Sequence, residues 1–262
     1  MATVYIAPIA QGSADGTSEA NAYAYSSLNT AESDAGSGGT ILFLDGTYSV
    51  SNITWDGNGI TYKSLNLHQA IISASTLRTI NIGNSTSTNI VIDGFHIKNM
   101  RFQVDAAVGT PAVALKNLKV EYLTALTSNY FGHIYGKSKQ VDISGSTFDL
   151  KFSSGDSVIY QGNSNSQVTN CTFNISATGL ANDAIQNYGS SARPDYRNCI
   201  FISDNSAAIH STGGLAVVND ASCTNCCIHD FGTSHTITAP NITADPQFVD
   251  SANGDFRLRP SS

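Results

Sequence analysis

The segment CTNCCIHDF, residues 223–231, contains three cysteines and a histidine within seven consecutive positions. Cys223, Cys226, Cys227 and His229 are ligand types that zinc prefers, at spacings that a zinc site tolerates. The two other cysteines of the chain lie in similar stretches, TNCTF and RNCIF. The segment is therefore either a metal site or one copy of a repeated structural motif.

Four short stretches, HIYG, VIYQG, AIQNYG and AIHSTG, place a polar or aromatic residue directly after an isoleucine. These residues are Tyr135, Tyr160, Gln186 and His210. A tyrosine ring can stack on a sugar while its hydroxyl forms hydrogen bonds, and amide and imidazole groups bind sugar hydroxyls. A row of them on one sheet predicts a carbohydrate-binding surface. The alternative is that exposed strand positions favour Tyr in any case.

Asp156 and Asp183 are the carboxylates nearest to this row, which itself contains none. They lie three and two residues before Ile159 and Ile185. Glycoside hydrolysis by the usual route needs two carboxyl groups at a set separation. The unequal offsets do not require these two side chains to stack, and capping of turns by loop aspartates is the alternative. We find no phosphate-binding loop, dinucleotide fingerprint or HExxH motif, so no cofactor and no metal are predicted.

A second motif occurs six times, as IDGFHI, LKNLKV, ISGSTF, VTNCTF, YRNCIF and CTNCCI. Its central residues are separated by 23, 28, 25, 28 and 27 positions, and they are Gly94, Asn117, Gly145, Asn170, Asn198 and Asn225. Apolar residues usually lie two before and one and three after the centre, which breaks the strand period of two. Gly and Asn most readily adopt the left-handed αL conformation, so each centre is predicted to be a sharp bend between two strands.

The isoleucines of the four short stretches recur at intervals of 25, 26 and 24 residues, between successive bends. Each repeat then holds a first strand, a turn, a second strand, the αL bend, a third strand and a loop. This is one coil of a parallel β-helix, in which each strand pairs with its equivalent one turn away, about 4.8 Å along the axis.

The ends of the chain fit this architecture. The stretch YSSLNTAESDAG, residues 25 to 36, is predicted to form a short helix that covers the open apolar end of the coils. We expect a single all-β domain over residues 1–262: an entry segment with its capping helix at 1–40, coils at 41–235 and a closing segment at 236–262. The register of residues 50–90 is left open.

The entry segment from YIAPIAQG to LDGTY, and the closing segment ADPQFVDSANGDFRLRP, resemble those of right-handed parallel β-helix proteins of the pectate-lyase-like superfamily. This resemblance implies the fold. It implies less about function, because the superfamily includes polysaccharide lyases, glycoside hydrolases, adhesins and bacteriophage tailspikes or fibres. In its pectin-degrading members, the groove lies on the sheet of first strands.

Composition and charge argue against nucleic-acid binding and membrane insertion. A net charge of −7 without a run of Lys or Arg argues against nucleic-acid binding. No stretch approaches the roughly 20 apolar residues of a membrane span, so we predict no membrane insertion. The N-terminus lacks the pattern of a signal peptide, which predicts synthesis in a cytoplasm without secretion.

Three functions are compatible with these observations. The first is a virion structural protein, a bacteriophage tail fibre or spike that binds a host polysaccharide or another glycan, contacts other virion proteins and forms a homotrimer. The second is a polysaccharide-degrading enzyme, a lyase or glycoside hydrolase, with active carboxylates from different coils. The third is a purely architectural rod. We take the first as the prediction, with no catalytic residue assigned beyond the candidates Asp156 and Asp183.

Alignment of the six repeats changes the interpretation of CTNCCIHDF. Asn225 becomes a bend, and Cys226 falls in the same column as Cys171 and Cys199, so the three are predicted to stack inside the core as small apolar side chains. Cys227 is then expected to point outward, away from Cys226. Zinc would require these side chains to converge, so the segment is predicted to be a sixth coil and not a metal site.

Overall fold

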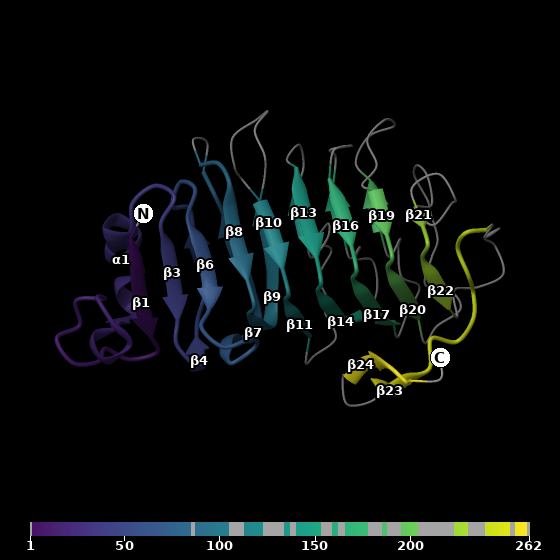
Figure 1. Ribbon diagram of the computed structural model, residues 1–262, viewed down its shortest axis with the longest axis horizontal. Coiled ribbons are helices and arrows are strands. Elements are labelled where there is room, and N and C mark those ends of the chain that lie inside the picture. Colours follow the sequence, from purple (N-terminus) through teal and green to yellow (C-terminus); the bar gives the residue numbers. More distant parts are fainter. Residues whose placement is uncertain are drawn as a thin grey trace.

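The computed structural model describes residues 2–84, 87–104, 113–122, 134–136, 140–152, 159–161, 166–177, 185–187, 195–203, 223–229, 239–251 and 255–260. Within them the chain forms a parallel β-helix whose strands lie side by side from the N-terminal to the C-terminal end (Figure 1). The predicted fold class is confirmed. One short α-helix lies near the N-terminus.

The strands that precede the αL bends form one sheet, here called the pre-bend sheet. Neighbouring strands in it pair in parallel, each with its equivalent in the next coil. In spatial order the strands are β2 (Tyr23–Ala24), β1 (Thr3–Ala7), β3 (Thr40–Phe43), β6 (Thr61–Ser64), β8 (Ile90–Asp93), β10 (Val113–Lys116), β13 (Val141–Ser144), β16 (Gln167–Thr169), β19 (Asp195–Arg197) and β21 (Cys223–Thr224).

A second parallel sheet has two branches, because its two long strands each contribute to both. The post-bend branch follows the αL bends and comprises β4 (Gly46–Ser49), the first parts of β7 (Ala70–Ile82) and β9 (His96–Val104), β11 (Lys119–Glu121), β14 (Thr147–Phe152), β17 (Thr172–Ala177), β20 (Ile200–Ser203) and β22 (Cys227–His229). The first-strand branch comprises β5 (Ile53–Trp55), the remainders of β7 and β9, β12 (Ile134–Gly136), β15 (Ile159–Gln161) and β18 (Ile185–Asn187). In β9 a positive φ at Asn99 separates the two parts.

The six repeat centres have the backbone conformation that the repeat predicts. The φ angle is 80° at Gly94, 59° at Gly145 and between 52° and 55° at the four asparagines. The N–H groups of the bends join neighbouring coils: Asn117 donates to the carbonyl of Ser144, and Asn170 donates to that of Arg197. Each bend therefore turns the chain while its backbone donor stays paired.

The core runs along the helix axis between the sheets. Inward-facing residues at equivalent positions stack from coil to coil, as Phe148, Phe173 and Phe201 do with ring centroids 4.9 and 5.1 Å apart. This separation is close to the strand spacing of about 4.8 Å, because each ring belongs to the next strand. The stacking of coils thus buries a continuous apolar column that no coil could bury alone.

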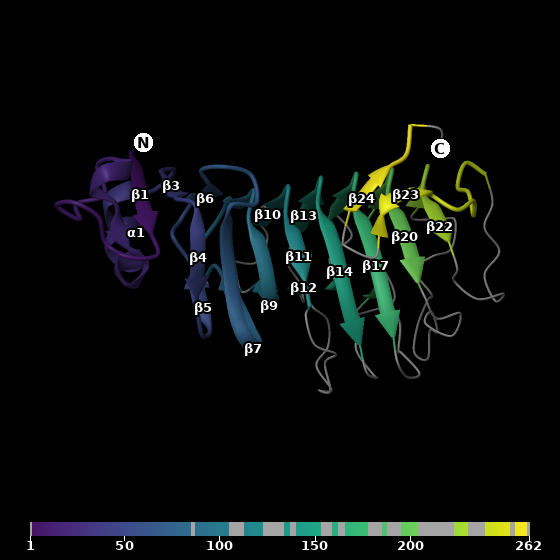
Figure 2. The same ribbon diagram turned by 90° about the horizontal axis from the view of Figure 1, so that it is seen from below.

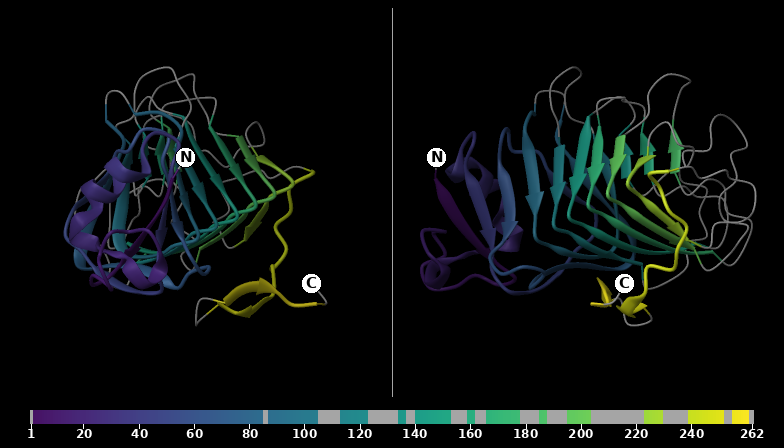
Figure 3. Two further views of the ribbon diagram at one scale, coloured as in Figure 1. Left: turned by 60° about the vertical axis from the view of Figure 1, so that its left-hand side comes forward. Right: turned by 45° about the vertical axis from the view of Figure 1, so that its right-hand side comes forward.

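Helix α1 (Leu28–Ala35) covers the N-terminal end of the coil stack. It follows a 3₁₀ turn at Tyr25–Ser27, ends at Gly36, and packs on β1 and β3 with its buried face of Leu28, Ala31 and Ala35. The closing segment forms the antiparallel hairpin of β23 (Phe248–Asp250) and β24 (Asp255–Leu258). Figures 2 and 3 show this hairpin outside the coil stack, near the strands of the post-bend branch.

The capping helix predicted at residues 25–36 is thereby confirmed. No helix of the described chain is both long and apolar enough to cross a membrane.

Candidate functional site

The outer face of the post-bend branch carries a continuous row of side chains that are polar in every coil but that of Ile202. The row lies four residues after each bend, where strand alternation directs the side chain away from the core. Its members are paired in register from strand to strand and are partly exposed. We call it the outer row, and it consists of Lys98, Glu121, Asp149, Asn174, Ile202 and His229.

One end of the outer row is an ion-pair cluster around Glu121. Lys119 Nζ lies 2.6 Å from Glu121 Oε1, while His96 Nε2 and Lys98 Nζ lie 2.8 and 3.7 Å from Oε2. The hydrogen bonds from His96 and Lys119 lower the pKa of Glu121 to about 2, against the opposing effect of burial. Glu121 is therefore ionised at neutral pH and cannot serve as a general acid.

The middle of the outer row brings two carboxylates onto neighbouring strands. Glu121 and Asp149 occupy paired positions of β11 and β14. Asp149 Oδ1 accepts a hydrogen bond of 2.9 Å from Asn174 Nδ2 on the next strand. A retaining glycosidase needs a protonated partner beside its nucleophile. Because Glu121 is ionised, it cannot be the protonated member of such a pair.

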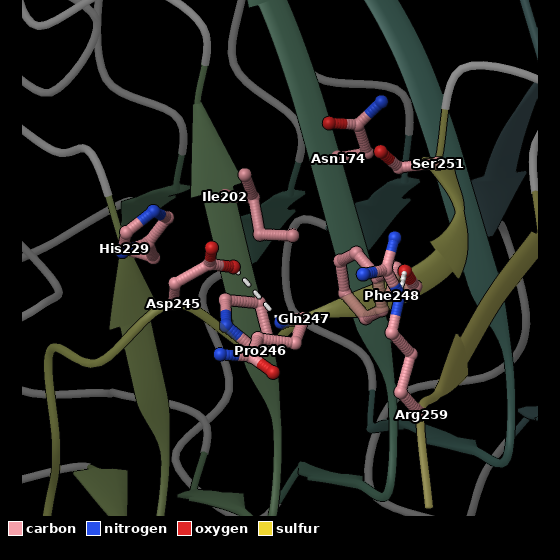
Figure 4. A pocket seen from close by; sticks show the side chains of 9 residues that line it. All are labelled: Asn174, Ile202, His229, Asp245, Pro246, Gln247, Phe248, Ser251 and Arg259. Atoms are coloured by element: carbon pink, nitrogen blue, oxygen red, sulfur yellow. Dashed lines mark hydrogen bonds between the residues drawn. The ribbon is translucent and has the colours of Figure 1, made fainter. Parts of the chain in front are cut away.

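The other end of the row forms a pocket of about 460 Å³ beneath the closing segment (Figure 4). Three successive strands, β17, β20 and β22, supply its floor, and the turn and hairpin after residue 244 supply its wall. It is lined by Asn174, Ile202, His229, Asp245, Pro246, Gln247, Phe248, Ser251 and Arg259. The pocket thus joins members of the outer row to residues that lie at least 16 positions later in the chain.

Hydrogen bonds hold the functional groups of this pocket in place. His229 Nδ1 lies 3.2 Å from the carbonyl oxygen of Thr243. Because a carbonyl only accepts, Nδ1 carries the proton and Nε2 is the basic nitrogen of the neutral ring. Asp245 Oδ1 accepts the Gln247 N–H at 2.8 Å, and Arg259 Nε donates to the Phe248 carbonyl at 2.9 Å. The pocket therefore combines an imidazole base, a carboxylate and a guanidinium.

The predicted sugar-binding row is aligned, but it lies on the other branch of the sheet. Tyr135 pairs with Tyr160, and Tyr160 pairs with Gln186, on β12, β15 and β18. Its fourth member, His210, lies outside the described residues, as do Asp156 and Asp183. A role in binding for the aligned row stays a prediction.

The repeat contained the signal for half of the pocket. The position four after each bend gives the outer row directly, and His229 is its last described member. Nothing in the repeat marks Asp245, Gln247 or Arg259, because the closing segment lies outside it. Their place in the site comes from the return of the chain over the sheet.

The cysteines of CTNCCIHDF follow the repeat. All five cysteines of the chain are reduced and buried, and Cys171, Cys199 and Cys226 each expose only 1% of their surface. Cys227, which is expected to point outward and away from Cys226, lies outside the core cluster, but it is not open to solvent. It is 8% exposed, because the closing segment covers it and the Ala244 carbonyl accepts its thiol at 3.2 Å. Among the described residues no group of three His, Cys, Asp or Glu side chains is arranged to hold a metal ion.

Comparisons with known proteins find likeness in three dimensions alone. No protein-family model and no curated sequence matches the chain. Solved structures that match include the pectin methylesterase PemA from Erwinia chrysanthemi, with a TM-score of 0.47 and 12% identity, covering 98% of both chains. A pectin methylesterase in complex with a hexasaccharide matches with a TM-score of 0.45, also at 12% identity and 98% of both chains. At this identity the likeness concerns the fold.

These matches correct one sequence-based prediction. The sequence predicts a bacteriophage structural protein, but the matching structures are described as pectin methylesterases, and neither is described as a tailspike or fibre. The virion prediction is therefore wrong. It rests on the superfamily resemblance, the lack of an export signal, the low charge, and a sheet surface suited to carbohydrate without evident catalytic acids.

Proposed function

We propose that the protein is a polysaccharide-degrading enzyme whose substrate binds in the pocket between the outer row and the closing segment. The observation that carries the proposal is the convergence of His229, Asp245 and Arg259 on one open pocket beside two amide side chains.

The pocket suits a sugar better than an apolar ligand. Its amides, carboxylate and hydroxyl can bind the hydroxyl groups of a sugar, and the Phe248 ring beside them offers an apolar surface. It is open along the outer row, where Asn174 and Asp149 continue the polar surface toward the preceding coils. A chain of sugars can therefore extend along the coil axis from the pocket.

The groups present favour an elimination over a hydrolysis. Asp245 is the single carboxylate among the described residues that line the pocket, whereas glycoside hydrolysis needs two. In an elimination, His229 Nε2 takes the proton from C5 of a uronic acid residue. The electron pair forms a C4–C5 double bond, the C4–O bond breaks, and the departing oxygen takes up a proton. The charge of Arg259 stabilises the carboxylate and the anion that develops beside it.

The experiment is an activity screen of the purified chain on acidic and neutral polysaccharides. New reducing ends together with the ultraviolet absorbance of unsaturated sugars are expected on a uronate-containing polymer. His229→Gln should lower the rate by about 10² to 10⁴-fold, the usual contribution of a general base. His68→Gln, a histidine outside the pocket, is the matched control and should keep full activity.

Three outcomes contradict the proposal in different ways. Reducing ends without absorbance would replace the lyase route with hydrolysis. Turnover that survives both His229→Gln and Asp245→Asn would move the active site away from this pocket. If the protein neither binds nor degrades any of the polymers, the interpretation that remains is a purely architectural rod.

A further inference from the structure

The inner cysteines form a cluster that the proposed function does not use. Cys171, Cys199 and Cys226 occupy the same position of three successive coils, directly after Asn170, Asn198 and Asn225. The register fixes this alignment, since Ile200 pairs with Cys227 and Thr172 pairs with Ile200. Cys223, two residues before the last bend, is buried beside them.

The backbone aligns Cys199 with Cys226 in the same way as it aligns Cys171 with Cys199. The N–H of Cys227 donates to the Cys199 carbonyl at 2.8 Å, so the two coils are joined at this level. Equivalent residues of neighbouring parallel strands lie about 4.8 Å apart, within the 4.4 to 6.8 Å that disulfides span between Cα atoms. Both side chains face the same core column. The pair is thus placed for a covalent link across the coils.

The thiols interact with one another and with a buried phenol. Hydrogen bonds from the thiols of Cys199 and Cys223 lower the pKa of Cys226. Hydrogen bonds with the thiols of Cys171 and Cys226, together with burial, raise the pKa of Cys199. Tyr196 lies close enough for the inner cysteines to affect its pKa, which burial raises most. Its hydroxyl is fully buried and has no hydrogen-bond partner among the described residues. A thiolate at Cys226 would therefore have donors around it.

The cluster also has an approach from outside. A pocket of about 380 Å³ lies against the last coils and is lined in part by Cys199, Cys226 and Cys227. Its remaining lining, which includes Pro240, Ile242 and Leu258, belongs largely to the closing segment. A small oxidant in this pocket therefore lies against the residues that carry the thiols.

We propose that Cys199 and Cys226 form a disulfide that links these two coils when the protein meets a peroxide. The Cys226 thiolate attacks one oxygen of the peroxide, which breaks the O–O bond and leaves a sulfenic acid and hydroxide. The Cys199 thiol then attacks the Cys226 sulfur, and water leaves. Overall, two thiols and one hydrogen peroxide give one disulfide and two waters, so the protein loses the two electrons that the peroxide gains.

The link would act on the strands that form the floor of the site. Ile202 and His229 lie three residues after Cys199 and Cys226, on β20 and β22. A covalent bond between these two strands fixes their register and closes the loop between the coils, which constrains the unfolded chain. Oxidation is therefore expected to raise the melting temperature, and a reducing agent should reverse the rise.

The test is thiol counting and peptide mapping of the intact protein after mild treatment with hydrogen peroxide. Free thiols should fall from five to three. Chymotrypsin cleaves after Phe201, so blocking of free thiols and digestion should yield the Cys199 peptide joined to the peptide that holds Cys223, Cys226 and Cys227. Cys199→Ser and Cys226→Ser should each abolish this product, whereas Cys227→Ser, the matched control, should retain it.

Other results overturn the proposal. These are five free thiols after treatment, a link within the second peptide alone, or a joined product that persists in Cys226→Ser. Should a serine variant fail to fold, mapping of the unmodified chain still decides between these outcomes. The assay needs no substrate, so its result is independent of the proposed activity.

Discussion

The two halves of the coil stack fill their cores in different ways. In the C-terminal half the rings of Phe148, Phe173 and Phe201 lie face to face, with interplanar angles of 8° and 7°. In the N-terminal half, Phe43 meets Tyr48 and Phe95 edge to face, at 63° and 82°. Parallel stacking results when each coil places the same residue at the same register.

The N-terminal coils instead fill a capped end with side chains of unequal size. Trp55, Tyr48 and Tyr62 are buried there, and the one pair of them that stacks face to face, Trp55 and Tyr62 at 14°, joins two rings of different type. A cap cannot be periodic, because it must close the column that the coils leave open. The regular half carries the proposed site, and the irregular half ends the solenoid.

Two glutamates show the same contrast in electrostatic terms. Glu121, on the outer face, has a lowered pKa because His96 and Lys119 bind its charged form. Glu32, on the capping helix, has a raised pKa, chiefly because burial penalises its charge. The coil surface therefore gains stability from an ionised carboxylate, whereas the cap loses stability when its carboxylate ionises.

The largest effect is expected from removal of a ring from the stack. Phe173→Ala takes away the partner of both Phe148 and Phe201 and should lower the free energy of unfolding by about 3 to 5 kcal/mol. Because each coil contacts its neighbours alone, hydrogen exchange should rise around β14, β17 and β20 and stay low in β3 and β6. Thr224→Ala, on an exposed position, is the control. Equal loss of protection in both halves would show that the two cores unfold as one.

A smaller effect is expected at Glu121. Its folded pKa of about 2 lies below the ordinary 4.5, so its contribution is present above pH 4.5 and is lost as the pH falls toward 2. Glu121→Gln should cost about 2 kcal/mol at neutral pH and flatten the acid limb of the stability curve. Glu19→Gln, at an exposed position, should leave that limb unchanged. An unaltered acid limb in Glu121→Gln would mean that the ion-pair cluster contributes nothing.

At the αL bends, the effect of a substitution on stability should depend on whether the new residue tolerates positive φ, and not on the side chain that is lost. Asn170 has φ 54°, so Asn170→Ala places an unfavourable residue in the αL region and should cost about 1 to 2 kcal/mol. Asn170→Gly removes the side chain without that penalty and should cost less. Denaturant unfolding of the two variants measures the difference. Equal losses would assign the role of Asn170 to its side chain.

The smallest effect is expected at the cap. Glu32 accepts a hydrogen bond from the buried Tyr62 hydroxyl, and its raised pKa means that stability is present at low pH and is lost as the pH rises through that pKa. Glu32→Gln keeps an acceptor without the charge and should stabilise the protein at neutral pH by less than about 1 kcal/mol. The gain should vanish below pH 4.5. A loss at neutral pH would show that the charge itself is required.

Much of the fold could be predicted because the repeat records it locally. An asparagine or glycine at a position that needs positive φ is a requirement of one residue, so it is visible without knowledge of any contact. The inward column of Cys171, Cys199 and Cys226 then follows from strand alternation. The same counting gives the outer row, four residues after each bend.

The site could be predicted only in part. His229 follows from the repeat, but Asp245 and Arg259 reach it through a closing segment that crosses back over the post-bend strands. The burial of Cys227 could not be predicted for the same reason, since alternation gives the direction of a side chain and not what lies above it.

The sequence by itself determined the coil, its bends and the faces of its strands, because each depends on residues within about one repeat of one another. Only the tertiary structure decided which outward face becomes a pocket. That choice depends on where a non-repeating segment settles, and its position results from contacts between residues far apart in the chain, for which local periodicity contains no signal.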